Sequence, residues 1–208
     1  MSLLFLIRHG DNDYVKTGRL AGLLPGIHLN EHGKNQAQNL ADILRNLPVK
    51  KIFSSPLERT FETAYPLSQK LGLDVEKCSG LAEIDTGLWT GQDVKKLRKF
   101  PEWEIVQNTP SRFVFPEGES FIACQVRLID TMESLLKPFS KNDIVLCFSH
   151  ADPIKIIISH YLGMPLDHFQ RLACNPACMT IFNISKSGYK LLLHNSLALP
   201  SENFIQSQ

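Results

Sequence analysis

The chain lacks both a long hydrophobic run and an excess of charge of one sign. The apolar run at residues 3–7 ends at an arginine. It is shorter than the core of a signal peptide and far shorter than the roughly 20 residues that span a bilayer. The 22 basic and 21 acidic residues are interspersed and leave a net charge of +1, which excludes a basic face for nucleic acid or an anionic membrane. We therefore expect a cytoplasmic protein with no nucleic-acid partner and no membrane partner.

The five cysteines are scattered and odd in number, so they indicate no disulfide framework. Cys174 and Cys178 have a spacing that suggests a metal site, but no second pair completes it. His28 and His32 likewise have no matching third ligand in the sequence. We therefore predict reduced thiols, no metal and no cofactor.

The length and composition fit one globular domain over residues 1–208, because 43% of the residues are hydrophobic and no repeat or linker interrupts them. Strand-like runs are predicted at residues 3–7, 51–54, 143–148 and 179–184, with a later partner at 191–194. The first of these runs, and the third from residue 144 on, are continuous apolar stretches. Such runs are typical of strands that are covered on both faces.

Apolar residues at helical spacing fill the intervals between these runs. One helix is predicted after Asn30 as its N-cap, and a second opens at Ser55 with proline at its first position. Two more cover residues 121–135 and 154–162. Strands that alternate with helices predict an α/β fold, a three-layer α/β/α sandwich with a mostly parallel central sheet.

The stretch at residues 83–119 breaks this alternation and is rich in proline, tryptophan and glycine. We predict that it forms a small insertion over the C-terminal edge of the strands, where long loops often cap a binding site. Its aromatic side chains either line an apolar mouth that receives an organic group or pack the insertion. They are Phe100, Trp103, Phe113 and Phe115. The polar tail after residue 200 is expected to fray.

Three strand-to-helix junctions carry polar signatures. Arg8 and His9 end the first run, Arg59 follows the second run in the first helical turn, and His150 ends the third. In open α/β sheets, ligands bind outside the carboxyl ends of the strands, where helix N-termini favour anions. Two arginines and two histidines that converge there predict a phosphate site. Taken singly, Arg59 also fits a surface helix and His150 fits a buried core position.

These junctions, together with further motifs in chain order, resemble the histidine phosphatase superfamily, in its phosphoglycerate-mutase-like group and RHG-motif phosphatase branch. The matching segments span most of the chain. They are Arg8-His9-Gly10, Arg19-Leu20-Ala21-Gly22, Leu29-Asn30-Glu31-His32-Gly33 with Gln36-Ala37, Ser55-Pro56-Leu57-Glu58-Arg59-Thr60 with Thr63-Ala64, Glu83-Ile84-Asp85-Thr86-Gly87 with Trp89 and Gly91, Pro116-Glu117-Gly118-Glu119-Ser120, and Ser149-His150. The resemblance implies phosphoryl-transfer chemistry on a small phosphorylated substrate.

Physical chemistry and the resemblance assign the same roles to the junction residues. A neutral imidazole of His9 can attack phosphorus and form a phosphohistidine, and it must be kept neutral to do so. The guanidinium groups of Arg8 and Arg59 oppose its protonation, because one charge at about 4 Å and an effective dielectric near 20 contributes roughly 4 kcal/mol. The same groups would hold the phosphoryl oxygens. His150 would donate hydrogen bonds to those oxygens.

Glu83 is the predicted proton donor to the leaving oxygen; the alternative is that it only caps a turn. Cations in the pocket lower the pKa of this carboxyl, whereas burial and an incoming phosphate dianion raise it, so the direction stays open. The resemblance further implies that four residues bind the substrate. They are Asn12, Arg19, Gly22 and Ala151.

The chain departs from the family pattern beside the predicted site. Asp11 and Asn12 stand where Glu-Thr often follows the RHG tripeptide, and Val15 replaces a frequent asparagine, which removes one phosphate contact. Ala151 replaces a common glycine but keeps its backbone N–H. Asp152 is unusual so close to an anion site, and it either caps the following helix or discourages highly charged substrates.

The predicted function is metal-independent hydrolysis of a phosphomonoester through a phosphohistidine. A phosphoglycerate mutase is the nearest alternative, which the basic residues of the insertion leave open and the chain length disfavours. A non-catalytic binder of phosphorylated ligands is a second alternative, and the presence of both His9 and Glu83 argues against it. No sequence feature decides the oligomeric state, so a homodimer stays open.

Overall fold

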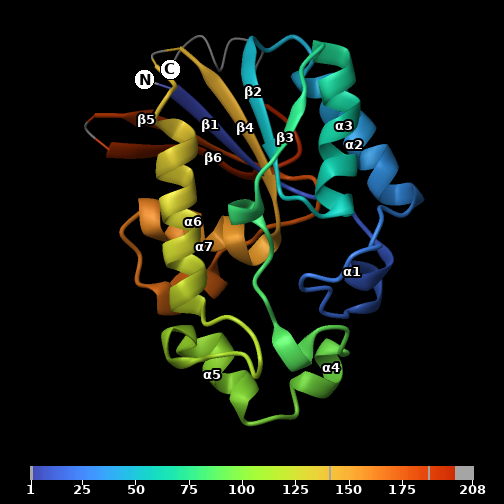
Figure 1. Cartoon of the computed structure of the whole chain (residues 1–208), viewed down its shortest axis with the longest axis vertical. Coiled ribbons are helices and arrows are strands. Elements are labelled where there is room, and N and C mark those ends of the chain that lie inside the picture. Colours follow the sequence, from blue (N-terminus) through green and yellow to red (C-terminus); the bar gives the residue numbers. More distant parts are fainter. Residues whose placement is uncertain (1, 141, 187, 200–208) are drawn as a thin grey trace.

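The computed structural model of the chain describes residues 2–140, 142–186 and 188–199. These residues contain a six-stranded sheet with the strand order β3-β2-β4-β1-β5-β6 (Figure 1). The strands are β1 (Ser2–Arg8), β2 (Val49–Ser54), β3 (Val75–Lys77), β4 (Ile144–Ser149), β5 (Met179–Ser185) and β6 (Gly188–Ser196).

Helices cover both faces of the sheet and extend beyond one end of it (Figure 1). The α-helices are α1 (Asp13–Thr17), α2 (Glu31–Leu44), α3 (Glu58–Leu71), α4 (Val94–Leu97), α5 (Glu102–Asn108), α6 (Phe121–Leu136) and α7 (Ala151–Tyr161). The short 3-10 helices are η1 (Ser79–Leu81), η2 (Gly87–Trp89), η3 (Pro110–Arg112) and η4 (Leu166–Arg171). Within the described ranges, no helix has the length and apolar character that crossing a membrane requires.

β1 lies inside the sheet and joins its parallel part to its antiparallel part. It runs parallel to β4, β4 runs parallel to β2, and β2 runs parallel to β3. β5 pairs antiparallel with β1, and β6 pairs antiparallel with β5. The predicted α/β/α sandwich with a mostly parallel sheet is therefore confirmed. The edge strand β3 was not predicted, because its three residues carry no apolar run.

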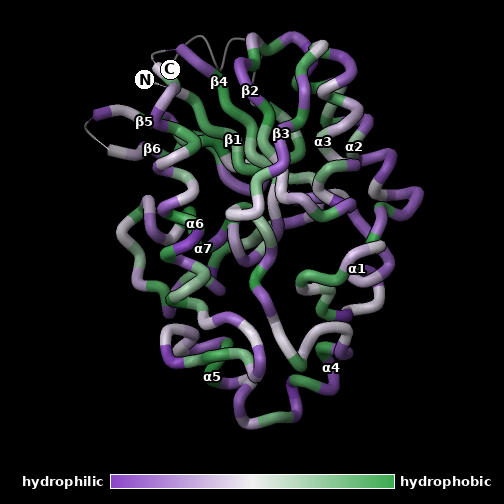
Figure 2. The backbone as a smooth tube through the Cα atoms, in the orientation of Figure 1, coloured by the Kyte–Doolittle hydropathy of each residue, from purple (hydrophilic) through white to green (hydrophobic). Residues whose placement is uncertain are grey.

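The side chains of β1 alternate between two hydrophobic cores, as the pleat of a strand requires. Leu4 and Leu6 pack in a cluster with α6 and α7, whereas Phe5 and Ile7 pack in a cluster with α2 and α3. All four side chains are 0% exposed. Because both faces are covered, β1 needs no polar face, and Figure 2 shows the hydrophobic colour running through the central strands.

The start of one helix agrees with the sequence prediction and the start of another differs. Asn30 is the N-cap of α2, and its side chain accepts a hydrogen bond from Gly33 N at 2.8 Å. The helix that was expected to open at Ser55 begins only at Glu58. The reason is that Ser55 N donates to Phe148 O at 2.9 Å, which extends the ladder between β2 and β4 past the end of the strand.

The segment predicted as an insertion contains α4 and α5, which lie beyond the carboxyl ends of the parallel strands (Figure 1). Its aromatic rings pack on one another. The ring centroid of Trp89 lies 5.2 Å from that of Phe113, 5.5 Å from that of Phe115 and 6.2 Å from that of Trp103. These rings therefore pack the segment, whereas Phe100 is exposed. The tail that was expected to fray lies outside the described residues.

A substitution at Gly33 tests the close contact between α2 and the segment that follows β1. A Cβ at Gly33 would lie 2.0 Å from Asp11 O. Alanine normally stabilises a helix by about 1 kcal/mol relative to glycine, but here we expect Gly33→Ala to lower the free energy of unfolding by about 1–3 kcal/mol, because the added atom overpacks the contact. Urea unfolding measures this, with the exposed Asn39→Ala in the same helix as a control within about 0.5 kcal/mol. Unchanged stability of Gly33→Ala would contradict the contact.

Candidate active site

The carboxyl ends of β1 and β4 lie side by side, which brings the two histidine junctions together. Arg8 is in register with Ser149, and His9 N donates to Ser149 O at 3.0 Å. The ring centroids of His9 and His150 are consequently 5.3 Å apart. β2 ends on the other side of β4, so α3, which carries Arg59, starts at the same edge of the sheet.

His9 is buried, and one of its ring nitrogens contacts a backbone carbonyl. Its Nδ1 lies 2.7 Å from Gly10 O, and since a carbonyl oxygen only accepts, Nδ1 carries the proton and donates it. The lone pair is then on Nε2, which is the form of histidine that can act as a nucleophile. Burial lowers the pKa of His9 well below its ordinary value, and the charges of Arg8 and Arg59 lower it further. The imidazole is therefore neutral near pH 7.

The guanidinium groups of Arg8 and Arg59 each bond a backbone carbonyl. Arg8 Nη1 donates to Cys174 O at 2.6 Å, and Arg59 Nη2 donates to Gly22 O at 2.8 Å. Among the described residues, neither guanidinium forms an ion pair. Arg8 Nε and both Nε and Nη1 of Arg59 are buried and find no hydrogen-bond acceptor in the same part of the chain. Buried cations with free donors are costly unless an anion meets them.

Further hydrogen-bond donors lie near His9 and the two arginines. Asn12 Nδ2 and His150 Nδ1 are buried and have no hydrogen-bond partner in the described ranges. His150 Nε2 lies 2.9 Å from Ser55 Oγ; when this hydroxyl donates, the ring proton of His150 is on Nδ1. Burial, followed by the charge of Arg59, lowers the pKa of His150 well below its ordinary value. α7 begins at Ala151, and its first N–H groups add a helix N-terminus that favours an anion.

Glu83 is an acid that titrates near neutral pH. Burial raises the pKa of Glu83 to about 7, and the negative charge of Asp152 adds to the rise. The hydrogen bond from Ile84 N to Glu83 Oε1, at 3.0 Å, and the charges of Arg59 and Arg8 act in the opposite direction. Burial therefore outweighs the cations, which sequence alone could not decide, and the Glu83 carboxyl keeps its proton to a higher pH than an ordinary glutamate.

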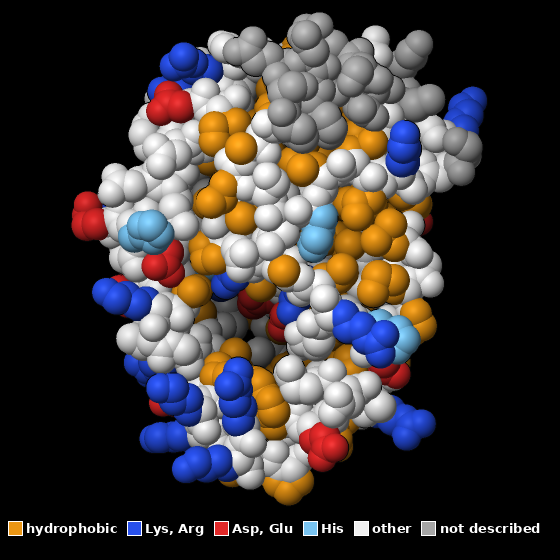
Figure 3. Space-filling model, turned by 180° about the vertical axis from the view of Figure 1, so that it is seen from behind, with side chains coloured by type: hydrophobic (Ala, Val, Ile, Leu, Met, Phe, Trp, Pro, Cys, Tyr) orange, Lys and Arg blue, Asp and Glu red, His pale blue; other side chains and the backbone are white. Residues whose placement is uncertain are grey.

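These groups share a cavity of about 190 Å³. In the view from behind, Figure 3 shows a hollow where acidic and basic side chains lie together. Of the residues that the sequence predicted for the site, eight line the cavity: Arg8, His9, Asn12, Arg19, Gly22, Arg59, Glu83 and Ala151. His150 does not line it and reaches the site through its ring contact with His9.

Two of the predicted substrate-binding residues also make contacts within the protein. Arg19 is exposed, its Nε donates to Gly91 O at 3.0 Å, and its guanidinium carbon lies 4.7 Å from the ring centroid of Tyr14. Gly22 supplies the carbonyl that binds Arg59 and has a φ of 48°, a left-handed conformation that favours glycine. Arg19 therefore lies at the rim of the cavity, and Gly22 positions Arg59.

Asp152 lines the cavity but does not cap α7, so that interpretation was wrong. The N-cap of α7 is His150, whose side chain forms no cap hydrogen bond. The Asp152 carboxylate instead pairs with Lys155 Nζ at 2.7 Å, one helical turn further on. Its charge favours the protonated form of Glu83.

Sequence reasoning named Thr63 and Ser55 within the matching motifs but gave them no role in the site. Thr63 Oγ1 accepts a hydrogen bond from Gly10 N at 2.9 Å and donates to Arg59 O at 2.6 Å, which ties α3 to the turn after β1. Ser55, directly after β2, contacts His150 through its hydroxyl group, which lies 2.9 Å from His150 Nε2. The sequence signal for Thr63 was its position four residues after Arg59, where a polar side chain stands on the apolar face of the helix.

Known proteins share both the sequence and the fold of this chain. The family model of the histidine phosphatase superfamily (branch 1) matches residues 4–197. The chain belongs to this superfamily. It is 30% identical over 209 residues to phosphoserine phosphatase 1 of Hydrogenobacter thermophilus, covering 100% of this chain and 98% of that protein. It is 28% identical over 185 residues to the 2,3-bisphosphoglycerate-dependent phosphoglycerate mutase of Thermoplasma acidophilum, covering 88% of each.

A solved structure of the same superfamily fold matches equally broadly. A phosphoserine phosphatase variant of Entamoeba histolytica in complex with phosphoserine has a TM-score of 0.84 and 25% identity, covering 95% of this chain and 98% of that one. The resemblance that was stated from the motifs alone is therefore confirmed. The named histidine phosphatase relatives are phosphatases and phosphoglycerate mutases.

The unpaired donors of this histidine phosphatase predict that inorganic phosphate binds. Arg59→Met should weaken phosphate binding about 10- to 100-fold, which is the loss expected for charge-assisted hydrogen bonds. The same change should leave the free protein as stable or more stable, because a buried unpaired charge is removed. Titration calorimetry and thermal unfolding measure these effects, with the exposed Arg45→Met as the control. Equal phosphate affinity of Arg59→Met and the unmodified protein would contradict the site.

Proposed function

We propose that the protein hydrolyses phosphomonoesters through a phosphohistidine formed at His9. The observation that carries the proposal is a neutral His9, with its proton on Nδ1, beside two guanidinium groups that form no ion pair within the described ranges and keep buried N–H groups without an acceptor there. A phosphoryl group would occupy the free donors of Arg8 and Arg59 and present phosphorus to Nε2. Phosphoryl transfer requires mainly positioning and charge compensation, which this arrangement supplies.

In the first step, His9 Nε2 attacks phosphorus and the bond between phosphorus and the ester oxygen breaks. The leaving oxygen takes the proton of the Glu83 carboxyl, so that an alcohol and a Glu83 carboxylate are formed. A pKa of about 7 makes this proton available near neutral pH. Arg8, Arg59 and His150 donate hydrogen bonds to the phosphoryl oxygens throughout.

In the second step, a water molecule attacks the phosphohistidine. The Glu83 carboxylate takes a proton from this water while the bond between phosphorus and His9 Nε2 breaks. Inorganic phosphate leaves, and both His9 and the Glu83 acid are restored. One carboxyl therefore serves first as an acid and then as a base, which a pKa near the working pH favours.

The relatives suggest which substrates to test first. Phosphoserine is the ester named for the relative from Hydrogenobacter thermophilus and is bound in the matching structure from Entamoeba histolytica. A cavity of about 190 Å³ suits a small ester, so phosphoserine and 3-phosphoglycerate form the first pair of substrates. Conversion of 3- to 2-phosphoglycerate without release of phosphate would favour the mutase. Binding of phosphate esters with no phosphate on His9 would favour the non-catalytic binder.

The phosphohistidine is the first test of the reaction. A short reaction with phosphoserine or an aryl phosphate, stopped with alkali, should place a phosphate on His9 that mass spectrometry locates and that acid removes. His9→Ala should lose about 10³-fold or more of the turnover, and EDTA should leave the rate of the unmodified protein unchanged. The exposed His160→Ala is the control. If His9→Ala turns over substrate as fast as the unmodified protein, the proposal fails.

The pKa of Glu83 predicts how the rate depends on pH. The kcat/KM for an alkyl phosphate should fall as the pH rises above about 7, because the acid loses its proton. Glu83→Gln should lower kcat/KM by about 10²-fold and abolish this alkaline decline. A Glu83→Gln protein that keeps the same alkaline decline would show that another group supplies the proton.

Stability provides an independent readout of the same carboxyl. The pKa of Glu83 in the folded protein lies above the ordinary value of 4.5. The folded state therefore loses stability as the pH rises from about 4.5 to about 7, because the carboxyl ionises in the unfolded chain while the buried one still holds its proton. Glu83→Gln removes this loss. Its Tm, relative to that of the unmodified protein, should therefore be higher at about pH 8 than at about pH 5.

We further propose that residues 83–119 cap the site within one domain of residues 1–208. Support comes from α4 and α5, which lie beyond the strand ends that carry the histidines (Figure 1). The cytoplasmic location stays a prediction, and the homodimer stays open beside a monomer. Light scattering of the purified protein decides the oligomeric state.

A further inference from the structure

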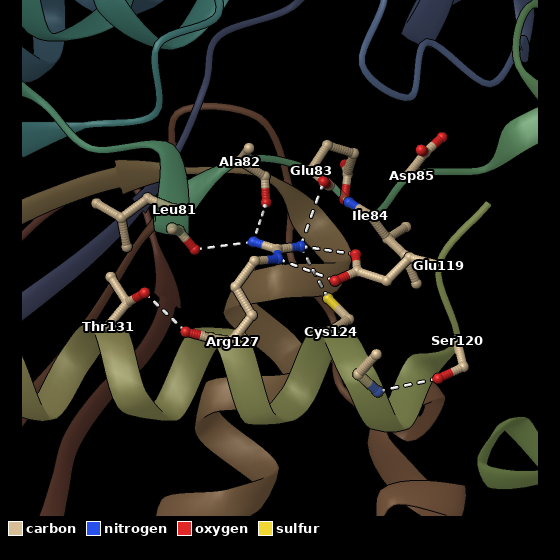
Figure 4. A network of polar contacts seen from close by, with 12 residues as sticks. Leu81, Ala82, Glu83, Ile84, Asp85, Glu119, Ser120, Cys124, Arg127 and Thr131 are labelled. Carbon is tan, nitrogen blue, oxygen red and sulfur yellow. Dashed lines mark hydrogen bonds and ion pairs between the residues drawn. The ribbon is translucent and has the colours of Figure 1, made fainter.

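Arg127, on α6, binds two segments that lie far apart in the sequence. Its Nε and Nη2 donate to the two carboxylate oxygens of Glu119 at 2.9 and 2.8 Å, a bidentate pair that suits a planar guanidinium. The two side chains are 27% and 17% exposed, so water competes less for this pair than for an exposed one. Figure 4 shows the guanidinium lying between Glu119 and the chain at residues 81–83.

The same guanidinium holds the backbone that leads into Glu83. Arg127 Nη1 donates to Gly80 O at 2.8 Å and to Ala82 O at 3.2 Å, and Nη2 donates to Glu83 O at 3.5 Å. The Glu83 carboxylate accepts a hydrogen bond from the next peptide, Ile84 N, at 3.0 Å. The place of the carboxyl therefore depends on a short piece of backbone whose carbonyl groups Arg127 binds (Figure 4).

Glu119 completes the connection at the far end of the 83–119 segment. Its N–H donates to Asp85 O at 2.8 Å. Gly118 packs so closely there that a Cβ would lie 2.5 Å from Asp85 O. One guanidinium thus joins both ends of the segment to α6, and the acid of the site lies at the first of these ends.

We propose that Arg127, held by Glu119, is a positioning residue that sets the Glu83 carboxyl at the distance from the ester oxygen that proton transfer requires. The inference rests on the proposed function. Arg127 does not line the described cavity, so it acts on Glu83 through the backbone. General acid catalysis requires hydrogen-bond contact between the acid and the leaving oxygen, and a displaced backbone would impair proton transfer more than phosphate binding.

Two substitutions perturb this contact in different ways. Arg127→Lys keeps the charge but replaces the fork with a single nitrogen, which cannot reach two carboxylate oxygens and several carbonyl groups together. Glu119→Gln keeps the shape of the side chain but loses its charge, and its amide N–H groups face the N–H groups of Arg127. Neither substitution alters a residue that lines the cavity.

Esters that need the proton to different degrees separate positioning of Glu83 from a general structural role. An alkyl phosphate must release an alkoxide and depends on the acid, whereas a nitrophenyl phosphate releases an anion that is stable without a proton. We measure kcat/KM, which covers the steps up to the phosphohistidine. Each variant should lose about tenfold or more with the alkyl ester and less than about threefold with the aryl ester.

A combined variant tests whether the effect passes through Glu83. In the Glu83→Gln background, Arg127→Lys should cause little further loss with the alkyl ester, because the group that it positions is already absent. The matched control is Arg45→Lys, at an exposed arginine on the other side of the sheet that pairs with Asp42 at 3.6 Å. It should change neither rate.

Equal losses with the two esters, or additive losses in the combined variant, would overturn this inference. If Arg127→Lys shows no cooperative thermal transition, Glu119→Gln carries the comparison, because it leaves the arginine in place. An unmodified protein that is inactive on both esters would overturn the proposed function and this inference together. An active protein whose variants do not discriminate between the esters would overturn this inference alone.

Discussion

Two guanidinium groups that form no ion pair within the described part of the chain are the constraint on which the rest of the site depends. Arg59 is 1% exposed and donates to the backbone carbonyl of Gly22, and the half-buried Arg8 donates to that of Cys174 from the end of β1. Holding both charges next to each other costs the free protein stability, and a bound dianion offsets that cost. Burial lowers the pKa of His9 and the same two charges lower it further, so the groups that recruit the phosphoryl group also help to keep the nucleophile neutral.

The acid of the site is balanced against these cations. Burial and the nearby charge of Asp152 raise the pKa of Glu83 by more than Arg8 and Arg59 lower it. Asp152 would itself disfavour an anionic ligand, but its carboxylate is paired with Lys155, which is 9% exposed. Asp152 thereby raises the pKa of Glu83, while Lys155 compensates most of the charge of Asp152 itself.

Much of this arrangement could be predicted from the sequence because it depends on local patterns. The apolar run of β1 indicated a strand covered on both faces, and polar residues directly after such strands meet at one edge of a parallel sheet. What depends on distant contacts could not be predicted. The delayed start of α3 follows from the hydrogen bond between Ser55 and Phe148, and the pKa of Glu83 follows from its burial beside Asp152. The proton position on His9 required the distance to a carbonyl.

A crystal structure with vanadate tests the central claim most directly, since vanadate has the geometry of phosphorus under attack. The account predicts a bond between vanadium and His9 Nε2, with Nδ1 still donating to Gly10 O. It also predicts that donors of Arg8 and Arg59 lie within hydrogen-bond distance of the vanadate oxygens. Vanadate bound away from His9, or with either guanidinium turned from it, would contradict the account.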